Sequence, residues 1–233
     1  MRVVAGIVAA LVGGPMALRA QQAPPSAVAA LPPGLDSAAR AALAPVFARA
    51  VQQGLPVMAL RVKAAEGVLH GVPSDRIVGV VTRFAERLVV AKAALAPAQP
   101  DEVSDGANAL GLGVSASVLR DIRKRRPATP VTIPLAVLVQ LVTQGIPASR
   151  AGDIVLRLLE RGASTQQLAE LPKVIDRDVA SGVSAERALD LRAANVLATL
   201  GPRPLPALPT AAAAAAPSMP VGVSNGNHSG GRP

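Results

Sequence analysis

The sequence contains no cysteine, tryptophan or tyrosine, and its only aromatic residues are Phe47 and Phe84. Without cysteine the chain has no disulfide, no thiolate metal ligand and no lipid attached at an N-terminal cysteine. A core without large rings has to be built from Leu, Val, Ile and Ala, each of which buries less apolar area than Phe or Trp. The composition therefore predicts a thin, layered core.

Residues that commonly carry catalysis are also scarce. His70 and His228 are the only histidines, and the sequence contains no HExxH, no P-loop, no Rossmann pattern and no Gly-x-Ser-x-Gly. Carbohydrate subsites usually rely on Trp and Tyr platforms, which are absent. We therefore predict no catalytic site, no metal and no cofactor; a cell-wall hydrolase that uses two carboxylates is the least favoured alternative.

The formal net charge is +9, and one short segment supplies much of it. The run from Arg120 to Arg126 holds five basic residues and one acidic residue. On a helix Arg120, Arg123 and Lys124 share a face, while Arg125 and Arg126 lie at the C-terminal end, where the helix dipole favours cations. The run is a candidate binding site for an anionic polymer or membrane surface. The alternative interpretation is a solvated last turn before Pro127.

A repeated segment organises the chain. Residues 71–87 return as residues 145–161, with identity at 7 of 17 aligned positions. The copies start 74 residues apart, which is twice 37, and steps of 37 reach Gly34 and Gly182; the middle step falls five residues short of Gly113. A small loop insertion would explain that displacement. Such internal periodicity predicts an all-α fold of stacked short helices, a helical-hairpin repeat that forms a superhelical or irregular bundle.

Turn signals and apolar spacing predict seven to nine helices between residues 34 and 200. In the first copy Ile77, Val80, Val81, Phe84 and Leu88 form one apolar stripe. Ser164 and Gln167 form a predicted capping box. The expected helices cover residues 37–53, 56–70, 73–95, 101–112, 115–126, 133–144, a helix in the second copy from about 147, 164–180 and 184–200.

The repeated residues have a structural rationale at the joints between helices. A Gly suits the left-handed position after a helix, and Pro or Ser two residues later suits the start of the next helix. Arg follows the Gly by five residues in three copies, although a first-turn Arg opposes its own helix dipole. Our hypothesis is that each Arg binds carbonyls of the preceding helix or a neighbouring carboxylate. The joint residues are Gly71, Pro73, Arg76, Gly145, Pro147, Arg150, Gly182 and Arg187.

Glu86 and Glu160 occupy equivalent positions of the two copies and are flanked by arginines. Structural ion pairs explain them more simply than a pair of catalytic carboxylates. His70 falls at a predicted helix end, where a histidine more often acts as a cap than as a ligand or base.

The two ends of the chain differ in composition from the middle. Residues 1–20 predict a secretory signal peptide: Arg2, an apolar run from Val3 to Val12, a Gly-Gly-Pro break and a small-residue cleavage site. Residues 21–33 predict a Pro/Ala-rich linker, residues 34–200 the helical repeat domain, and residues 201–233 a Pro/Ala/Gly tail without ordered structure. We expect an exported protein, periplasmic or secreted, without a transmembrane segment once the signal is removed.

These features favour a non-catalytic helical protein that binds or scaffolds a protein partner, because stacked helical repeats work through extended surfaces. The alternative function is electrostatic binding of an anionic envelope polymer or membrane surface through residues 120–126. Sequence-specific nucleic-acid binding is not expected, because the chain is predicted to be exported and lacks stacking aromatics.

Overall fold

A computed structural model describes residues 31–200 of the chain. These residues form nine α-helices and no strand, which confirms the all-α class. The predicted signal peptide, residues 21–30 of the predicted linker, and the predicted tail with His228 lie outside the described residues. The helices are α1 (Ser37–Gln52), α2 (Val57–Leu69), α3 (Ser74–Leu95), α4 (Pro100–Gly111), α5 (Ala116–Arg125), α6 (Thr132–Thr143), α7 (Ala148–Glu160), α8 (Thr165–Ala180) and α9 (Ala185–Thr199).

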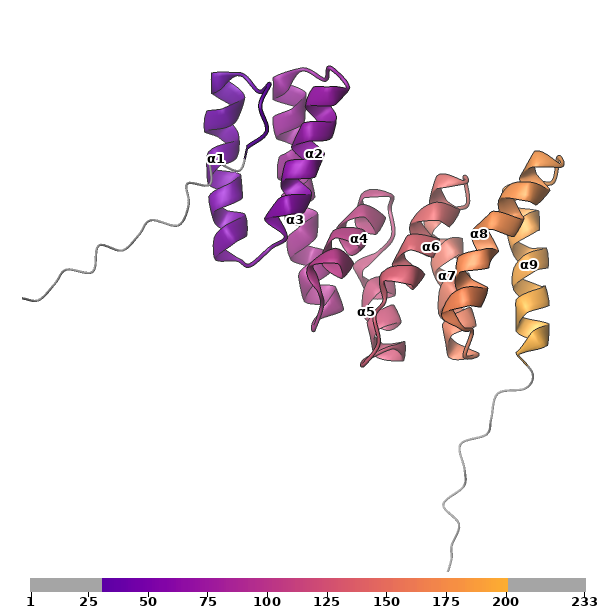
Figure 1. The fold of residues 1–233 in the computed structure, drawn as a ribbon. Helices are drawn as coiled ribbons and strands as arrows, with labels where there is room; N and C mark the ends of the chain where they lie inside the picture. Colours follow the sequence, from indigo (N-terminus) through magenta and orange to yellow (C-terminus); the bar gives the residue numbers. More distant parts are fainter. Residues whose placement is uncertain (1–30, 201–233) are drawn as a thin grey trace, which may run out of the picture.

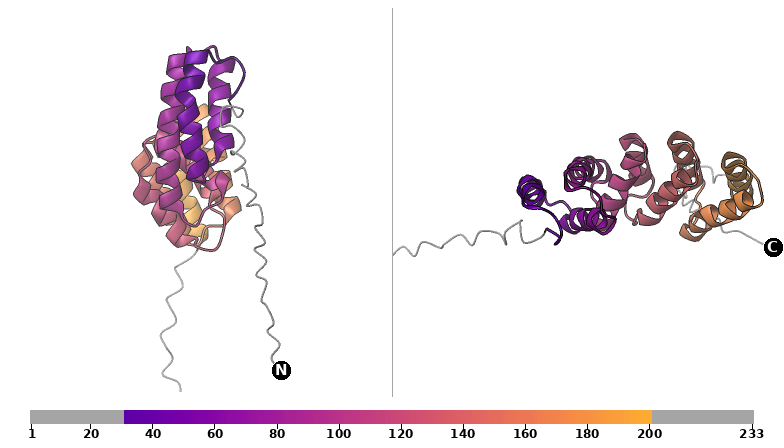
Figure 2. Two further views of the ribbon diagram at one scale, coloured as in Figure 1. Left: turned by 90° about the vertical axis from the view of Figure 1, so that its left-hand side faces the viewer. Right: turned by 90° about the horizontal axis from the view of Figure 1, so that it is seen from above.

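The helices stack in two layers. In one layer α1, α3, α5, α7 and α9 follow one another, each packed on the next, and in the other layer α4 packs on α6 and α6 on α8. The layers are joined where α2 and α4 pack on α3, α6 on α7, and α8 on α9. Helices α1 and α9 lie at opposite ends of the array (Figure 1), and the view from above shows the two layers end-on (Figure 2). The predicted stack of short helices is confirmed.

A continuous apolar core lies between the layers and consists almost entirely of aliphatic side chains. Four of the five residues of the predicted stripe on α3 are buried, with Phe84 only 2% exposed. Val80 is the exception: it is 37% exposed, so its assignment to the core was wrong. It sits at the edge of the stripe, where α3 extends beyond the helices that cover its other half. In the second copy the four equivalent residues, Ala151, Ile154, Val155 and Leu158, are all buried.

Six joints between helices share one hydrogen-bond pattern. At the joint after α2, Gly71 has φ +64°, its N–H donates to the Val68 carbonyl at 3.0 Å, and the Val72 N–H donates to the Gly67 carbonyl at 2.9 Å. This is the Schellman arrangement, in which a left-handed residue lets two N–H groups turn back to the last carbonyls of the helix. The same pair of bonds occurs at Gly54, Gly113, Gly145, Gly162 and Gly182.

The joints are not evenly spaced, and the reason differs from the predicted loop insertion. Joints Gly71 and Gly113 lie 42 residues apart, whereas Gly145 and Gly182 lie 37 apart. The loops in the two units have equal lengths, but α3 has 22 residues against 13 in α7, and α4 has 12 against 16 in α8. The nine residues gained in α3 and the four residues lost in α4 together account for the five-residue displacement of Gly113. The extra residues therefore lie in a helix.

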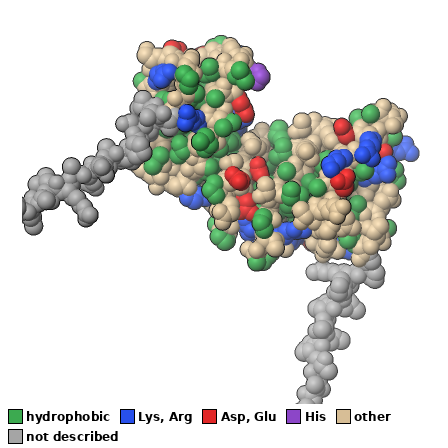
Figure 3. All heavy atoms as spheres, in the orientation of Figure 1, with side chains coloured by type: hydrophobic (Ala, Val, Ile, Leu, Met, Phe, Trp, Pro, Cys, Tyr) green, Lys and Arg blue, Asp and Glu red, His purple; other side chains and the backbone are tan. Residues whose placement is uncertain are grey.

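The length of α3 produces a step in the molecule. The guanidinium carbon of Arg87 lies 3.2 Å from where a Cβ on Gly111 would sit, so the middle of α3 is level with the end of α4. The N-terminal half of α3 continues past that point together with α1 and α2. This block stands above the shorter helices α4–α9 (Figure 1), and the same step is visible in the molecular surface (Figure 3).

Candidate functional site

Arg123, the centre of the predicted basic face, is buried inside the fold. It is 8% exposed, and its Nη2 donates to Glu102 Oε2 at 2.7 Å. Its Nε donates to the Leu95 carbonyl at 3.0 Å, and its Nη1 donates to the carbonyls of Arg126 and Thr129. The guanidinium thus joins the end of α3 to α4 and to the loop after α5. Arg123 is not a surface residue, and the prediction that it shares an exposed cationic face was wrong.

Glu102 holds the other half of this connection. Its Oε2 accepts the Gln99 N–H at 2.9 Å in a capping box, and its Oε1 accepts the Val131 N–H at 2.8 Å just before α6. Burial acts to raise the pKa of this carboxyl group, but the two N–H donors and Arg123 outweigh it, so the pKa is lowered from its ordinary value. The carboxylate is therefore ionised and fully bonded in the folded protein.

The remaining cations of the run are divided between internal bonds and solvent. Arg125 pairs with Glu160 of α7, and Arg126 Nη2 donates to the Ala163 carbonyl at 3.0 Å. Lys124 pairs with Asp121 at 3.4 Å, and its side chain is 73% exposed. Arg120 is exposed and makes no hydrogen bond or ion pair within residues 31–200. Only Arg120 and Lys124 of the five candidates therefore present their charge to solvent with little involvement in the fold.

The three first-turn arginines of the repeat do not share one role. Arg150 bridges to α9, with Nη1 2.7 Å from Glu186 Oε2 and Nη2 2.5 Å from Asp190 Oδ2, as our hypothesis requires. Arg76 and Arg187 are exposed and have neither a carbonyl nor a carboxylate partner among the described residues. The hypothesis holds for Arg150 alone, because only α7 is followed in its layer by a helix that places acidic residues opposite the Arg.

The predictions for Glu86, Glu160 and His70 compare differently with the structure. Glu160 forms an ion pair with Arg125, as predicted, while Glu86 is exposed and has no ion pair within residues 31–200. His70 is the residue that ends α2, at the helix end predicted for it. The two glutamates therefore differ, although they occupy equivalent repeat positions.

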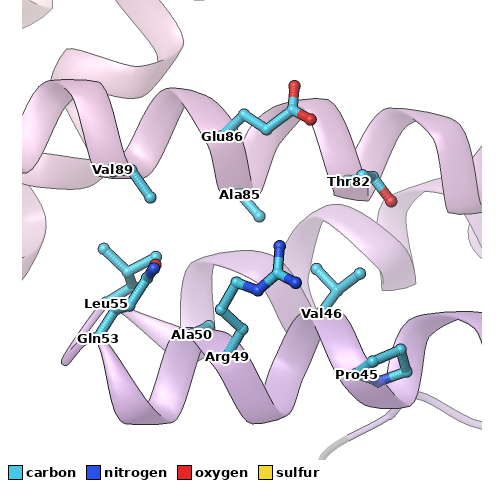
Figure 4. Close-up of a pocket in the computed structure, with 10 residues that line it drawn as sticks. All are labelled: Pro45, Val46, Arg49, Ala50, Gln53, Leu55, Thr82, Ala85, Glu86 and Val89. Atoms are coloured by element: carbon cyan, nitrogen blue, oxygen red, sulfur yellow. The ribbon is translucent and has the colours of Figure 1, made fainter.

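Glu86 instead lines a groove between α1 and α3. The groove has a volume of about 250 Å³, and its walls are mostly small apolar or polar side chains with one basic and one acidic residue. Arg49 extends from α1 into the space between the helices, and the Glu86 carboxylate points away from it (Figure 4). The lining residues are Pro45, Val46, Arg49, Ala50, Gln53, Leu55, Thr82, Ala85, Glu86 and Val89.

A second hollow continues the groove toward the start of both helices. It has a volume of about 320 Å³ and is lined by Ala38, Ala39 and Ala42 of α1 and by Val78 of α3, with two aspartates at its end. The lining positions of α1 recur every three or four residues along its length, as do those of α3, so both hollows lie on the same pair of helix faces. The groove and the second hollow therefore follow one another along α1, whose 16 residues span about 24 Å at 1.5 Å per residue.

The second hollow carries two acidic residues, whereas the groove carries one basic and one acidic residue. Asp36 and Asp75 line the end where α1 and α3 begin. The pKa of Asp36 is lowered, first because its carboxylate accepts the Ala39 N–H, so it is ionised. At the other end Lys92 Nζ donates to the carbonyls of Gln53 and Gly54, 2.6 and 3.1 Å away, and fixes the end of α1 against α3.

Sequence reasoning missed this groove. The available signal was the row of small or polar residues at Ala38, Ala42, Pro45 and Arg49, spaced by three or four along one face of α1. Ala and Pro fill less space between helices than Leu or Phe, so such a row leaves a hollow beside a neighbouring helix. The identity of that neighbour depends on tertiary packing.

Neither a metal site nor a membrane-spanning helix is found among the described residues. Within residues 31–200 no group of three or more His, Asp or Glu side chains is close enough to hold a metal ion. No helix in that range combines the length and the apolar character that crossing a membrane requires.

Comparison of the chain with protein-family models, with curated proteins and with solved structures finds no match in any of the three.

Proposed function

We propose that the protein is a non-catalytic binding or scaffolding module that holds a helical segment of a protein partner in the groove between α1 and α3. The observation that carries this proposal is the groove itself, together with the second hollow that follows it along α1. An amphipathic helix that lays its apolar face into such a groove is a common mode of peptide recognition. A partner helix of about 16 residues would match the length of α1.

The charges on the rim define the chemistry of the partner. Arg49 and Glu86 have no ion-pair partner within residues 31–200, although both line the groove. An acidic side chain of the partner opposite Arg49 completes a bidentate pair, while its apolar positions cover Val46, Ala85 and Val89. The acidic end at Asp36 and Asp75 favours the N-terminus of the bound helix, because the helix dipole is positive there.

The proposal also includes the cellular compartment in which the protein meets its partner. The features of residues 1–20 support export, so we place the interaction in the periplasm or outside the cell. The partner is then expected among proteins of that compartment.

The absence of cysteine provides a direct test. A single cysteine at Thr82 places a photoactivatable cross-linker in the groove, and a cysteine at the exposed Ala198 of α9 serves as the matched control. Proteins captured from an envelope extract are identified by mass spectrometry, and the purified candidate is titrated against the wild-type protein. We expect a protein that is captured from position 82 and not from position 198.

Charge reversal then tests the contact itself. Arg49→Glu is expected to lower the affinity for that protein at least about tenfold, or about 1.4 kcal/mol, because an ion pair becomes a repulsion. Arg187→Glu makes the same change at an exposed residue of α9 that has no partner within residues 31–200, and it is expected to leave the affinity unchanged. Equal capture at both positions, or equal affinity of the two variants, would show that the groove is not the binding site.

A further inference from the structure

A row of arginines lies on the flank of α3 that faces away from the groove. Arg76, Val80, Arg83 and Arg87 follow one another at i, i+4, i+7 and i+11, so they form one stripe along the helix. Because Arg87 lies against Gly111 at the end of α4, the stripe runs from that point along the part of α3 that extends past α4. The stripe therefore forms one wall of the step between the α1–α3 block and the shorter helices, where Val80 is exposed.

The three guanidinium groups lack anionic partners. Within residues 31–200 none of them forms an ion pair or a hydrogen bond, and the Nε of Arg87 is buried without an acceptor. Arg123, Arg150 and Arg192, in contrast, each contact a carboxylate. A buried donor without an acceptor is uncommon in proteins.

Two glycines lie beside these arginines, and one of them provides space for a guanidinium group. The Nη1 of Arg83 lies 3.4 Å from where a Cβ on Gly79 would sit, and the guanidinium carbon of Arg87 lies 3.2 Å from the equivalent point on Gly111. Both glycines are inside or at the end of a helix, where each costs about 0.5–1 kcal/mol relative to Ala. A Cβ on Gly79 would make an ordinary van der Waals contact with Arg83, whereas one on Gly111 would require Arg87 to shift, so only Gly111 makes room for a guanidinium group.

The surroundings of the stripe are electropositive. The ring of Phe84 lies 5.8 Å from Lys63 Nζ and 5.8 Å from the guanidinium carbon of Arg87, so two cations flank one ring. Glu66 neutralises Lys63 through an ion pair at 2.7 Å. The nearest unpaired carboxylates of α3, Asp75 and Glu86, line the groove on the other flank. Three positive charges therefore remain uncompensated along the stripe.

We propose that the Arg76–Arg83–Arg87 stripe binds a linear phosphate polymer. The stripe extends over eleven residue steps, from Arg76 to Arg87, or about 16 Å of helix, which a single phosphate cannot bridge but a chain of phosphates can follow. Each guanidinium offers parallel donors that match phosphate oxygens. The described residues contain no exposed aromatic side chain for stacking bases, so the contact depends on the phosphates alone. This site is separate from the groove and from the basic run of α5.

The test uses the full chain and inorganic polyphosphate as the probe, measured by titration calorimetry at several salt concentrations. The triple variant Arg76→Gln/Arg83→Gln/Arg87→Gln removes the stripe. The matched control, Arg61→Gln/Arg157→Gln/Arg187→Gln, removes the same charge from three exposed arginines that also lack partners within residues 31–200. Circular dichroism of all three proteins confirms that the helices are retained.

We expect the wild-type protein to bind polyphosphate more tightly at low salt, with weaker binding to orthophosphate. The stripe variant is expected to lose affinity at least about tenfold and to lower the slope of log affinity against log salt by about two, because each phosphate contact contributes about 0.7 on a single strand. The control is expected to retain most of the binding. Equal losses in the two variants, no binding by the wild type, or preferential binding of anionic vesicles through the same arginines would each overturn the proposal.

Discussion

Arg123 and Glu102 form the one ion pair within residues 31–200 in which both side chains are at most 10% exposed, with 2.7 Å between Nη2 and Oε2. The pair is surrounded by backbone bonds, since Arg123 also holds the carbonyl of Leu95, and Glu102 holds the N–H of Val131. The loops before α4 and before α6 contain no glycine joint, so this network replaces the Schellman pattern found at the other turns.

Removing the cation from this network is expected to destabilise the fold strongly. Arg123→Ala leaves the Glu102 carboxylate buried and unpaired and should lower the free energy of unfolding by about 3–5 kcal/mol. Arg120→Ala, three residues away and exposed, should change it by less than about 0.5 kcal/mol. Chemical denaturation monitored by circular dichroism measures both values. Similar losses in the two variants would mean that the buried pair is not a structural element.

The same pair makes stability depend on pH. The pKa of Glu102 is lowered in the folded protein from an ordinary value of 4.5, so the unfolded chain takes up a proton more readily than the folded one. The stabilisation by Glu102 is fully present above about pH 4.5, and it is lost as the pH falls through the pKa of Glu102 in the folded protein. We expect the unfolding free energy of the wild-type protein to decrease below pH 4.5, and Glu102→Gln to show a shallower decrease. Parallel curves would contradict this role for Glu102.

The basic run shows what a sequence can and cannot reveal about a site. Its charge and helical spacing were visible, but the buried side of α5 was not identified correctly. Arg123 points inward because its neighbours Leu119 and Ile122 are core residues. Its partner Glu102 lies opposite it in the fold but 21 residues earlier in the chain. Which residue pairs with a given charge depends on the tertiary structure. The sequence alone therefore could not show which cations of the run are buried and which are exposed.

The fold was easier to predict, because its main determinants are local. Each Schellman joint needs only a glycine and the last residues of one helix, and the capping box of Ser164 and Gln167 is confirmed by bonds of 2.9 and 3.1 Å. The groove was missed because it requires knowing that α1 packs beside α3. The length of α3 was also expected from its apolar pattern, but the step it creates depends on the short neighbours α4 and α5.

The joints can be tested at Gly145, where the backbone effect is isolated. Its φ is +90°, and nothing lies within 4 Å of where a Cβ would be, so a side chain there meets strain without a clash. Gly145→Ala should cost about 1–2 kcal/mol, and Gly145→Asn should cost less, because Asn tolerates the left-handed region. Thermal unfolding should show a decrease of a few degrees for Ala. Equal melting temperatures for the two variants would contradict the role assigned to the joint.

Arg150 and Arg123 both bridge neighbouring helices, but their different exposure should give them different contributions to stability. Arg150 contacts Glu186 and Asp190 on α9, but its side chain is 39% exposed, so water and salt screen the attraction. We expect Arg150→Ala to lower the free energy of unfolding much less than Arg123→Ala does, and by a smaller amount at high salt than at low salt. Denaturation of this variant and of Arg123→Ala at two salt concentrations provides the comparison. A salt-independent loss at Arg150 as large as that at Arg123 would show that the link to α9 is a rigid part of the core, because solvent then has no access to the pair.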